Sequence, residues 1–439
     1  MLVFFFPETP SQIVVGLLIA FASALVLACL LAARDMLAAA RLPVIKLLAT
    51  KSAPELSLLP SHHWHLFLSH IWGSGQDQCA IIKRQLCLLM PGASIFLDVD
   101  DLESIEKLEE YVDATALIMI FVSKGYFTSR NCLREAVCTV NKHKRITLVH
   151  DSAVYLKSYA KLEEIKDELG SERAATELVK AQAGVEEGRL LSTAQLRSAI
   201  FQEDTPTPRK VIPWHRIKDF QMQSLKLLAE QLLLSCPNET RKQIGLFVPG
   251  ELPREKMALK PGLLVYASPH NPGAKQVADD LRAAMGSGFE VTSNPEVGLS
   301  TATYFMLYLN NQTYLGEAGE RLADELRVAM GLSGKAPGVK VVMVHENDAA
   351  RGGCDFGIFF DGRTPEDLKQ GGIYGPLALA LYSGSFWPVS VALVAKALGA
   401  TDARSCDKFF RTAQAVRQAP LPRPSPTAAS APAASAPAA

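Results

Sequence analysis

The chain of 439 residues is 48% hydrophobic, which is enough for two ordinary domains with complete cores. Its 45 basic and 45 acidic side chains cancel, so the overall charge predicts no nucleic-acid partner. The eight cysteines form no C-x-x-C pair, which disfavours a zinc site or a disulfide framework and is typical of a reducing compartment. They stand at positions 29, 79, 87, 132, 138, 236, 354 and 406.

The first predicted element is a membrane-spanning helix. Residues 13–33 form an apolar run of 21 residues without a charge, long enough to cross about 30 Å of hydrocarbon. A cleaved signal peptide is the alternative, but the run is longer than usual and no basic residue precedes it.

The charges around this run predict its orientation. Only Glu8 precedes it, whereas four basic residues follow: Arg34, Arg41, Lys46 and Lys51. The positive-inside rule then puts the chain after residue 34 in the cytoplasm. We therefore expect a single-pass membrane protein with an anchor at 1–35 and a juxtamembrane linker at 36–61.

Three short apolar strands come next, at 66–69, 94–98 and 116–122, each followed by a loop and a helical pattern. This alternation predicts a parallel sheet covered by helices. The third strand contains the run LIMIFV, as expected of a central strand buried on both faces.

The predicted sheet continues with strands at 145–151 and 210–213 and a helix at 217–234. Residues 152–209 separate these two strands. They are rich in charge and alanine at helical spacing, so we expect a helical insertion rather than a loop. The sequence leaves open whether the insertion covers a pocket or only decorates an edge. The first domain is expected to span 62–236.

Polar residues gather where the predicted strands end, the edge at which parallel sheets meet ligands. They are Ser69, His70, Asp98, Asp100, Asp101 and Ser123. The acids suggest a metal site, but Asp100 followed by Glu103 is also a capping-box pattern, which is favoured, so we predict no metal. By spacing alone, Glu135 lies off the apolar stripe of its helix and would be a solvated first-turn acid.

Three strings in this region resemble the Toll/interleukin-1 receptor (TIR) domain family. The first strand ends in FLSH, the second ends in FLD before an acidic loop, and the third is followed by an aromatic residue and S-x-x-C-L-x-E. The resemblance covers about residues 64–151. It implies a flavodoxin-like parallel five-stranded sheet with helices on both faces, and association with other TIR domains through the loop after the second strand.

Some TIR domains cleave NAD+, and the resemblance implies which residues would do so here. Glu135 stands at the position of the catalytic glutamate of those members. Residues implied to contact the dinucleotide are Ser69, His70, Trp72, Asp98, Glu103 and Asn131. Asn131 departs from the family, because many catalytic members have a tryptophan there. NAD+ would be a substrate, so no cofactor is expected.

Beyond a linker at 237–261, the order of elements recurs, which predicts a second, degenerate TIR-like copy at 262–400. Strand 263–268 echoes the first strand, and Glu325 echoes Glu135. Only about ten residues separate Thr292 from Thr303, too few for an acidic loop and a helix. This copy is therefore expected to be non-catalytic and to pack against the first or to bind a partner.

The remainder of the second copy follows the same order. A fourth strand is expected from Lys340, and residues 354–360 (CDFGIFF) are expected to form the fifth element. A structural strand-end role is favoured for His345 and Glu346 over an acid–base pair. The tail at 401–439 is rich in Pro, Ala and Ser and cannot bury enough apolar area to fold.

Three functional classes remain. The first is a membrane-anchored signalling protein that acts through TIR–TIR association in the cytoplasm. The second is an NAD+ nucleosidase that cleaves the nicotinamide–ribose bond with Glu135 as the catalytic carboxylate. The third is a flavodoxin-like domain that binds a small molecule and gives Glu135 no role. The sequence favours the first class and retains the residue that the second requires.

Overall fold

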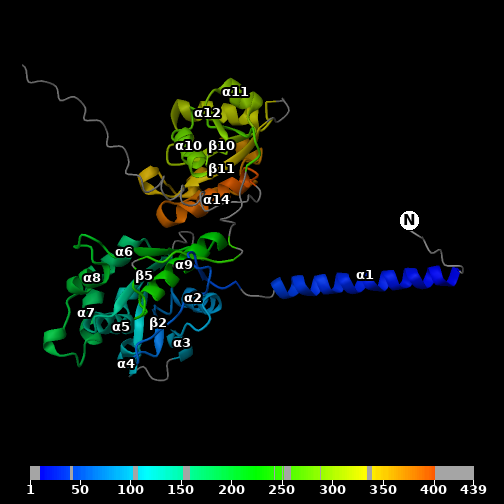
Figure 1. Ribbon diagram of the computed structural model, residues 1–439. Coiled ribbons are helices and arrows are strands. Elements are labelled where there is room, and N and C mark those ends of the chain that lie inside the picture. Colours follow the sequence, from blue (N-terminus) through cyan, green and yellow to red (C-terminus); the bar gives the residue numbers. More distant parts are fainter. Residues whose placement is uncertain are drawn as a thin grey trace, which may run out of the picture. The chain divides into compact units, whose positions relative to one another are not determined.

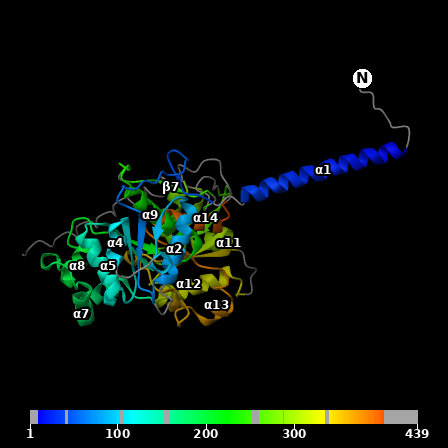
Figure 2. The ribbon, with the colours of Figure 1, turned by 90° about the horizontal axis from the view of Figure 1, so that it is seen from below.

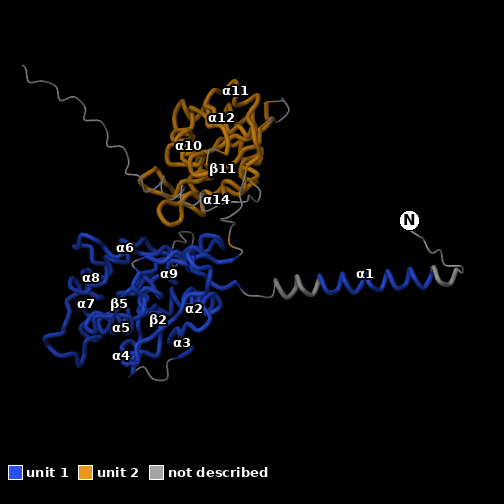
Figure 3. The backbone as a smooth tube through the Cα atoms, in the orientation of Figure 1, with its two compact units in different colours: residues 1–250 blue, residues 251–439 orange. Residues whose placement is uncertain are grey.

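The computed structural model divides into two compact units, residues 1–250 and residues 251–439 (Figure 3). Each unit contains one five-stranded parallel sheet. The structure describes residues 10–39, 43–101, 107–151, 159–241, 243–249, 251, 259–286, 288–333 and 339–400.

The first helix, α1 (Pro10–Ala39), contains the apolar run of the sequence. It is long and apolar enough to cross a bilayer. The side chains of Val14–Leu31 are all exposed, so this is not a core helix of the described chain. A signal sequence near the amino terminus passes the same test, so α1 is a candidate span.

The first sheet has the strand order β3-β2-β4-β5-β6, with all neighbouring strands parallel. Counted along the chain, this is the order 2-1-3-4-5 of flavodoxin-like sheets. The connections leave β2 and β4 toward opposite sides, which opens a crevice at the carboxyl edge between these strands. The strands are β2 (Trp64–Ser69), β3 (Ile95–Phe96), β4 (Thr115–Val122), β5 (Arg145–Asp151) and β6 (Val211–Trp214).

Helices cover both faces of this sheet (Figures 1 and 2). On one face, α2 (Gln76–Leu89) and α9 (Lys218–Leu234) bury their apolar side chains against those of β2 and β4. On the other face, α4 (Leu108–Asp113) and α5 (Arg130–Asn141) do the same. The apolar strand β4 supplies side chains to both clusters, as its sequence predicts.

The segment after β3 differs from the prediction. A helical turn, α3 (Asp98–Asp101), already begins at Asp98, so Asp100 lies inside it and the interpretation of Asp100 as a helix cap is wrong. Its expected capping partner, Glu103, lies outside the described residues. Asp101 instead accepts the backbone N–H of Leu97 at 2.8 Å and binds Lys83 Nζ at 2.6 Å, which closes the turn on itself.

A small antiparallel ladder, not predicted from the sequence, joins the two ends of the first unit. Strand β1 (Lys46–Leu47) pairs with β7 (Leu246–Phe247). The neighbouring side chains Ile45 and Ile244 are buried in the same cluster as α2 and α9. The core of the first unit therefore extends on both sides of residues 62–236.

The helical insertion between β5 and β6 packs on α5. Its side chains Leu178, Leu196 and Phe201 are buried in one cluster with Leu133 and Val137 of α5, and Figure 1 shows α7 and α8 beside α5. The insertion therefore forms a further layer over α5, which the sequence could not decide. Its elements are α6 (Leu162–Asp167), η3 (Glu168–Gly170), α7 (Glu172–Ala181), η4 (Glu187–Arg189) and α8 (Thr193–Phe201).

The second sheet repeats the topology of the first, with the order β12-β11-β10-β8-β9 and parallel neighbours throughout. Read along the chain, this is again 2-1-3-4-5. Its strands are β8 (Leu264–Tyr266), β9 (Glu290–Thr292), β10 (Tyr304–Leu309), β11 (Lys340–Glu346) and β12 (Leu379–Leu381).

Helices cover both faces of the second sheet as well. α10 (Ala274–Ala284) and α14 (Trp387–Ala397) pack on one face. α11 (Pro295–Thr301) and α12 (Gly316–Ala329) lie on the other. Shorter helical elements are η5 (Ala349–Arg351), η6 (Phe356–Phe359), α13 (Glu366–Gln370) and η7 (Gly384–Phe386).

Two expectations for the second unit are wrong. The fifth strand is β12, at Leu379–Leu381, whereas residues 354–360 contain the short helix η6. The interval between Thr292 and Thr303 does accommodate a helix, because α11 needs only seven residues and starts on an Asn294 cap.

Candidate functional site

Glu135 lies on α5 and points into the first unit. The helix begins after Ser129, and Glu135 follows in its second turn with only 6% of its surface exposed. The expectation of a solvated acid is therefore wrong. The apolar stripe of α5 faces the sheet and the insertion. The side of α5 that carries Glu135 is covered by residues that follow β2 and β3, so the carboxylate is not exposed to solvent.

The Glu135 carboxylate is hydrogen-bonded to one buried hydroxyl group, which is in turn bonded to a second. Ser69 Oγ, at the end of β2, donates to Glu135 Oε2 at 2.5 Å. Tyr126 of η2 (Tyr126–Thr128) is hydrogen-bonded to the same Ser69 Oγ. Because Ser69 gives its hydrogen to Glu135, Tyr126 is the donor in this second bond.

Burial raises the pKa of Glu135 to about 8. The hydrogen bond from Ser69 works against this rise, because it stabilises the ionised form. The negative charge of Asp98 adds to the rise, the positive charge of Arg134 opposes it, and Glu109 adds a little more. At neutral pH the carboxyl group therefore carries its proton most of the time, and a cation in the cavity would ionise it.

Asp98 connects two other side chains of the site. Its Oδ2 accepts the indole N–H of Trp72 at 2.6 Å, and its Oδ1 lies 3.7 Å from His70 Nε2. His70 Nδ1 is 3.1 Å from the carbonyl oxygen of Leu68, which fixes the ring and places a hydrogen on Nδ1. His70 Nε2 is buried and has no hydrogen-bond partner among the described residues.

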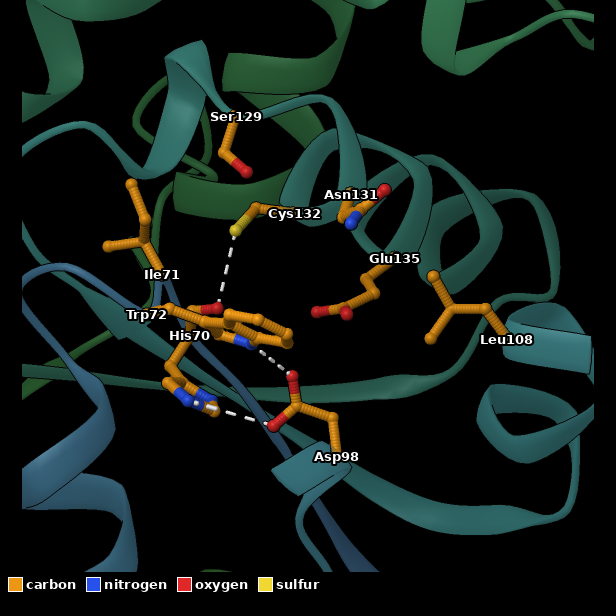
Figure 4. A pocket seen from close by; sticks show the side chains of 9 residues that line it. All are labelled: His70, Ile71, Trp72, Asp98, Leu108, Ser129, Asn131, Cys132 and Glu135. Carbon is orange, nitrogen blue, oxygen red and sulfur yellow. Dashed lines mark hydrogen bonds and ion pairs between the residues drawn. The ribbon is translucent and has the colours of Figure 1, made fainter. Parts of the chain in front are cut away.

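These side chains surround a cavity of about 250 Å³ at the carboxyl edge of the sheet, beside the switch between β2 and β4. Figure 4 shows the Glu135 carboxylate, the Trp72 indole and the Asp98 carboxylate around this space. The cavity is lined by His70, Ile71, Trp72, Asp98, Leu108, Ser129, Asn131, Cys132 and Glu135. Trp72 stands at its open side with 64% of its surface exposed.

The structure brings together most of the residues implied by the sequence. His70, Trp72, Asp98, Asn131 and Glu135 line the cavity, and Ser69 is bonded to Glu135 behind it: five lining residues and one support. Glu103 lies outside the described residues. Asp100 is paired with Lys83 at 3.0 Å and does not line the cavity. Within the described ranges, no cluster of His, Cys, Asp and Glu has the arrangement of a metal site.

Sequence reasoning missed Cys132 and Tyr126. Cys132 precedes Glu135 by three residues and so shares its side of α5, a spacing visible in the sequence. Its thiol donates to the carbonyl oxygen of His70 at 3.3 Å, and burial raises its pKa well above the usual range, so it is not a thiolate nucleophile. Tyr126 gave no such signal, because it meets Ser69 only through the tertiary fold.

The corresponding region of the second unit also buries an acid. Glu325 of α12 is buried, and its Oε1 lies 3.8 Å from His270 Nε2. Its Oε2 makes no hydrogen bond of normal geometry among the described residues, and burial together with the nearby Glu325 raises the pKa of the Tyr266 hydroxyl. Gly298 of α11 lies so close to the Tyr266 ring that a Cβ there would stand 2.1 Å from a ring carbon.

Comparisons with known proteins show a distant likeness to solved structures. No protein-family model and no curated protein sequence matches the chain. Among solved structures, the chain is similar to a chain in the structure of the activated Roq1 resistosome directly recognizing the pathogen effector XopQ (TIR domains). The identity is 16%, the TM-score is 0.26, and the match covers 38% of this chain and 98% of that chain. Neither value supports a transfer of function, which has to be argued from the site.

Proposed function

We propose that the first unit is a TIR-type domain that cleaves the bond between nicotinamide and ribose in NAD+, with Glu135 as the catalytic carboxylate. The observation that carries this proposal is the burial of Glu135 at a cavity that also contains a second carboxylate, Asp98. A solvated helix acid would support no such chemistry. The sequence strings around Ser69, Asp98 and Glu135 supply the substrate class.

Cleavage of the nicotinamide–ribose bond is favoured by a negative charge close to that bond. When the bond between C1′ of the ribose and the nicotinamide nitrogen breaks, the electron pair leaves with nicotinamide and positive charge develops on the sugar. An ionised Glu135 stabilises that charge in a site with little water, where electrostatic effects are large. Nicotinamide departs as a neutral molecule, so no general acid is needed. Water then attacks C1′ and releases its proton.

The raised pKa of Glu135 fits a substrate that carries a positive charge. The nicotinamide ring of NAD+ is cationic, so its binding favours the ionised carboxylate and lowers the pKa from about 8. Analogues whose ring carries no charge, including the dihydronicotinamide ring of NADH, lack this contribution. The cavity of about 250 Å³ is smaller than the roughly 300–1,000 Å³ that enclose drug-sized ligands, so it would hold the nicotinamide and ribose rather than the entire dinucleotide.

The proposal is tested by incubating the full chain, purified in detergent, with NAD+ and measuring free nicotinamide by chromatography. Release that is lost in the Glu135→Gln variant supports the enzyme. The matched control is Glu110→Gln, which changes an exposed carboxylate of α4 outside the cavity lining. Absence of release at high protein concentration contradicts the proposal. A small-molecule-binding domain without chemistry would bind NAD+ or another ligand and leave it intact.

We further propose that the domain associates with other copies of itself and that association completes the pocket. Two features support this: Trp72 is largely exposed at the open side, and Asn131 on the same rim is also exposed. If so, the rate per mole of protein rises with protein concentration in parallel with the mass measured by light scattering. Self-association without NAD+ cleavage would favour the signalling role, and a rate independent of concentration would contradict assembly of the pocket.

We propose that α1 anchors the chain in a membrane with the rest of the chain in the cytoplasm. The apolar, exposed stretch Val14–Leu31 and the basic residues after it support this. An anchored chain stays with membranes during alkaline carbonate extraction, and deletion of residues 1–35 releases it. A mature chain that lacks these residues by mass spectrometry would identify α1 as a cleaved signal sequence instead.

A further inference from the structure

The helical insertion reaches the turn that precedes α5. Glu168 of η3 accepts two backbone N–H groups of that turn with its carboxylate, from Gly125 at 2.6 Å and from Phe127 at 3.2 Å. These groups belong to the end of the connection from β4 to η2. A carboxylate that receives two N–H bonds fixes both peptide groups at once, since bonds to a charged acceptor are stronger than neutral ones.

The same turn is packed as well as hydrogen-bonded. Phe127 is fully buried, and its ring meets Phe201 of α8 edge to face with centroids 5.8 Å apart. On its other side, the Phe127 ring meets Tyr126 at 5.0 Å. Gly125 has φ of +89°, a left-handed conformation that glycine adopts without strain. The turn therefore has one well-defined position, set largely by the insertion.

Tyr126 links the turn to the catalytic carboxylate through Ser69. Its hydroxyl donates to Ser69 Oγ, which donates to Glu135 Oε2 at 2.5 Å. All three side chains are buried, so water does not compete for these bonds. A donor bond received by a hydroxyl strengthens the bond that the hydroxyl itself donates. A continuous series of contacts thus runs from Glu168 through the turn to Glu135.

We propose that Glu168 is a positioning residue for Glu135: it holds the turn 125–127 so that Tyr126 keeps Ser69 bonded to the Glu135 carboxylate. None of residues 159–209, the described part of the insertion, lines the cavity, so Glu168 acts only through the turn. A role of Glu168 in catalysis depends on the proposed NAD+ cleavage. Its effect on the titration of Glu135 is independent of that proposal.

The expected consequence is a change in the protonation of Glu135. The bond from Ser69 stabilises the ionised carboxylate, so loosening it raises the pKa of Glu135. The other titratable groups that face Glu135 stay in place when Glu168 is replaced. They are Asp98 at the end of β3, His70 after β2, Glu109 on α4, Arg134 and Cys132 on α5, Cys79 on α2 and Tyr126 on η2.

The experiment compares full-length variants in detergent. The titration of Glu135 is followed by carbon NMR of labelled glutamate carboxyl groups, with Glu135→Gln identifying its signal. Glu168→Ala is expected to raise the midpoint by about half to one unit, which is less than the roughly 1–2 units expected if a hydrogen bond to a charged group were lost completely. Tyr126→Phe removes the next contact and is expected to shift it in the same direction. Glu168→Gln keeps one acceptor oxygen and is expected to shift it less.

The matched control is Arg209→Ala. Arg209 donates to the carbonyl oxygens of Ala199 and Ile200 at the end of α8, so its loss weakens the insertion without removing either hydrogen bond from Glu168 to the turn. An unchanged midpoint in this variant, with shifts in the other three, supports the role of Glu168. Midpoints of Glu168→Gln and Tyr126→Phe within about 0.2 unit of the unsubstituted chain would overturn it, as would an equal shift in Arg209→Ala.

Activity adds a second, independent reading. If the chain cleaves NAD+, the pH at which the rate reaches half its maximum moves with the NMR midpoint in each variant, and Arg209→Ala leaves it unchanged. If the chain does not cleave NAD+, the proposed function fails, and the carboxyl titration alone still decides whether Glu168 positions Glu135.

Discussion

The two units bury a glutamate at the same place in sheets of the same topology, but different side chains surround the two acids. Phe67 in β2 and Tyr266 in β8 occupy equivalent positions, because Phe67 pairs with Ile118 of β4 and Tyr266 with Phe305 of β10. In the first unit, Ser69 donates to Glu135. In the second unit, α11 lies directly on the Tyr266 ring through Gly298. A shared fold thus buries an acid in both units, while the element that packs beside the first strand differs between them.

The largest expected effect separates the two acids. Glu135→Gln removes the charge that stabilises the developing cation, and we expect a loss of at least about 100-fold in NAD+ cleavage, as for the removal of one strong electrostatic contact. Glu325→Gln is expected to change cleavage less than twofold. Measurement of nicotinamide release from both variants tests the difference. Equal losses would mean that the second unit takes part in the chemistry.

Glu135→Gln also has a signature that does not depend on activity. The folded-state pKa of about 8 lies above the value of 4.5 for a free carboxyl group, so the folded chain holds a proton that the unfolded chain releases. The stability contributed by Glu135 is complete below about pH 4.5 and is lost as pH rises toward 8. The unfolding temperature of the variant should fall less over this interval than that of the unsubstituted chain.

The second prediction uses pH to examine the first site alone. Since Glu135 acts ionised, kcat/KM for NAD+ should rise about tenfold per unit from pH 6 to 7 and level off above pH 8. The profile of kcat should level off at a lower pH, because the bound cation favours the carboxylate. Initial rates at several NAD+ concentrations between pH 5.5 and 9 give both profiles. A flat kcat/KM profile would contradict a role for an acid with this pKa.

A third substitution tests the close contact between Gly298 of α11 and the ring of Tyr266. Gly298→Ala puts a methyl group into the Tyr266 ring, which forces α11 away and is expected to destabilise the second unit by roughly 1–3 kcal/mol. Chemical unfolding of the chain measures this cost. Gly188→Ala is the control, since a Cβ there meets nothing within 4 Å. If Gly298→Ala lowered the free energy of unfolding no more than the control does, the close contact between α11 and Tyr266 would not be needed for stability.

The smallest effect is expected for a substitution that gives the second unit the side chain found at the equivalent position of the first. Tyr266→Phe removes a buried hydroxyl that lies near Ser268 and Glu325 without a hydrogen bond of normal geometry, and gives the side chain found at Phe67. We expect stability to be unchanged or to rise by up to about 1 kcal/mol, because an unsatisfied buried polar group is costly. Chemical unfolding should detect the difference. A loss of more than about 1 kcal/mol would mean that the hydroxyl makes a stabilising interaction, for instance through water.

The sequence predicted the elements of the first sheet well, because each strand is a continuous apolar run bounded by polar loops. Strand β5 coincides with the predicted 145–151. The burial of Glu135 was not predictable from helical spacing, because that spacing reports only the apolar side of α5 and not what covers the other side. The ladder of β1 and β7 was missed for a related reason: two residues contain no periodicity.

The second unit shows where apolar patterns mislead. Residues 354–360 are as apolar as a strand, but Phe356, Phe359 and Phe360 pack around His345 and one another as a short helix and its end. The actual fifth strand, β12, has only three residues. Aromatic side chains suit both structures, and only the tertiary packing distinguishes them.

The pairing of β1 with β7 sets where the first unit can be cut. Ile45 and Leu47 on one side and Ile244, Leu246 and Val248 on the other contribute buried side chains to a shared cluster. A recombinant fragment that starts at the first long strand, Trp64, or stops after α9 would expose part of this cluster and favour aggregation. Soluble expression of the isolated unit should therefore require a start before Ile45 and an end beyond Val248.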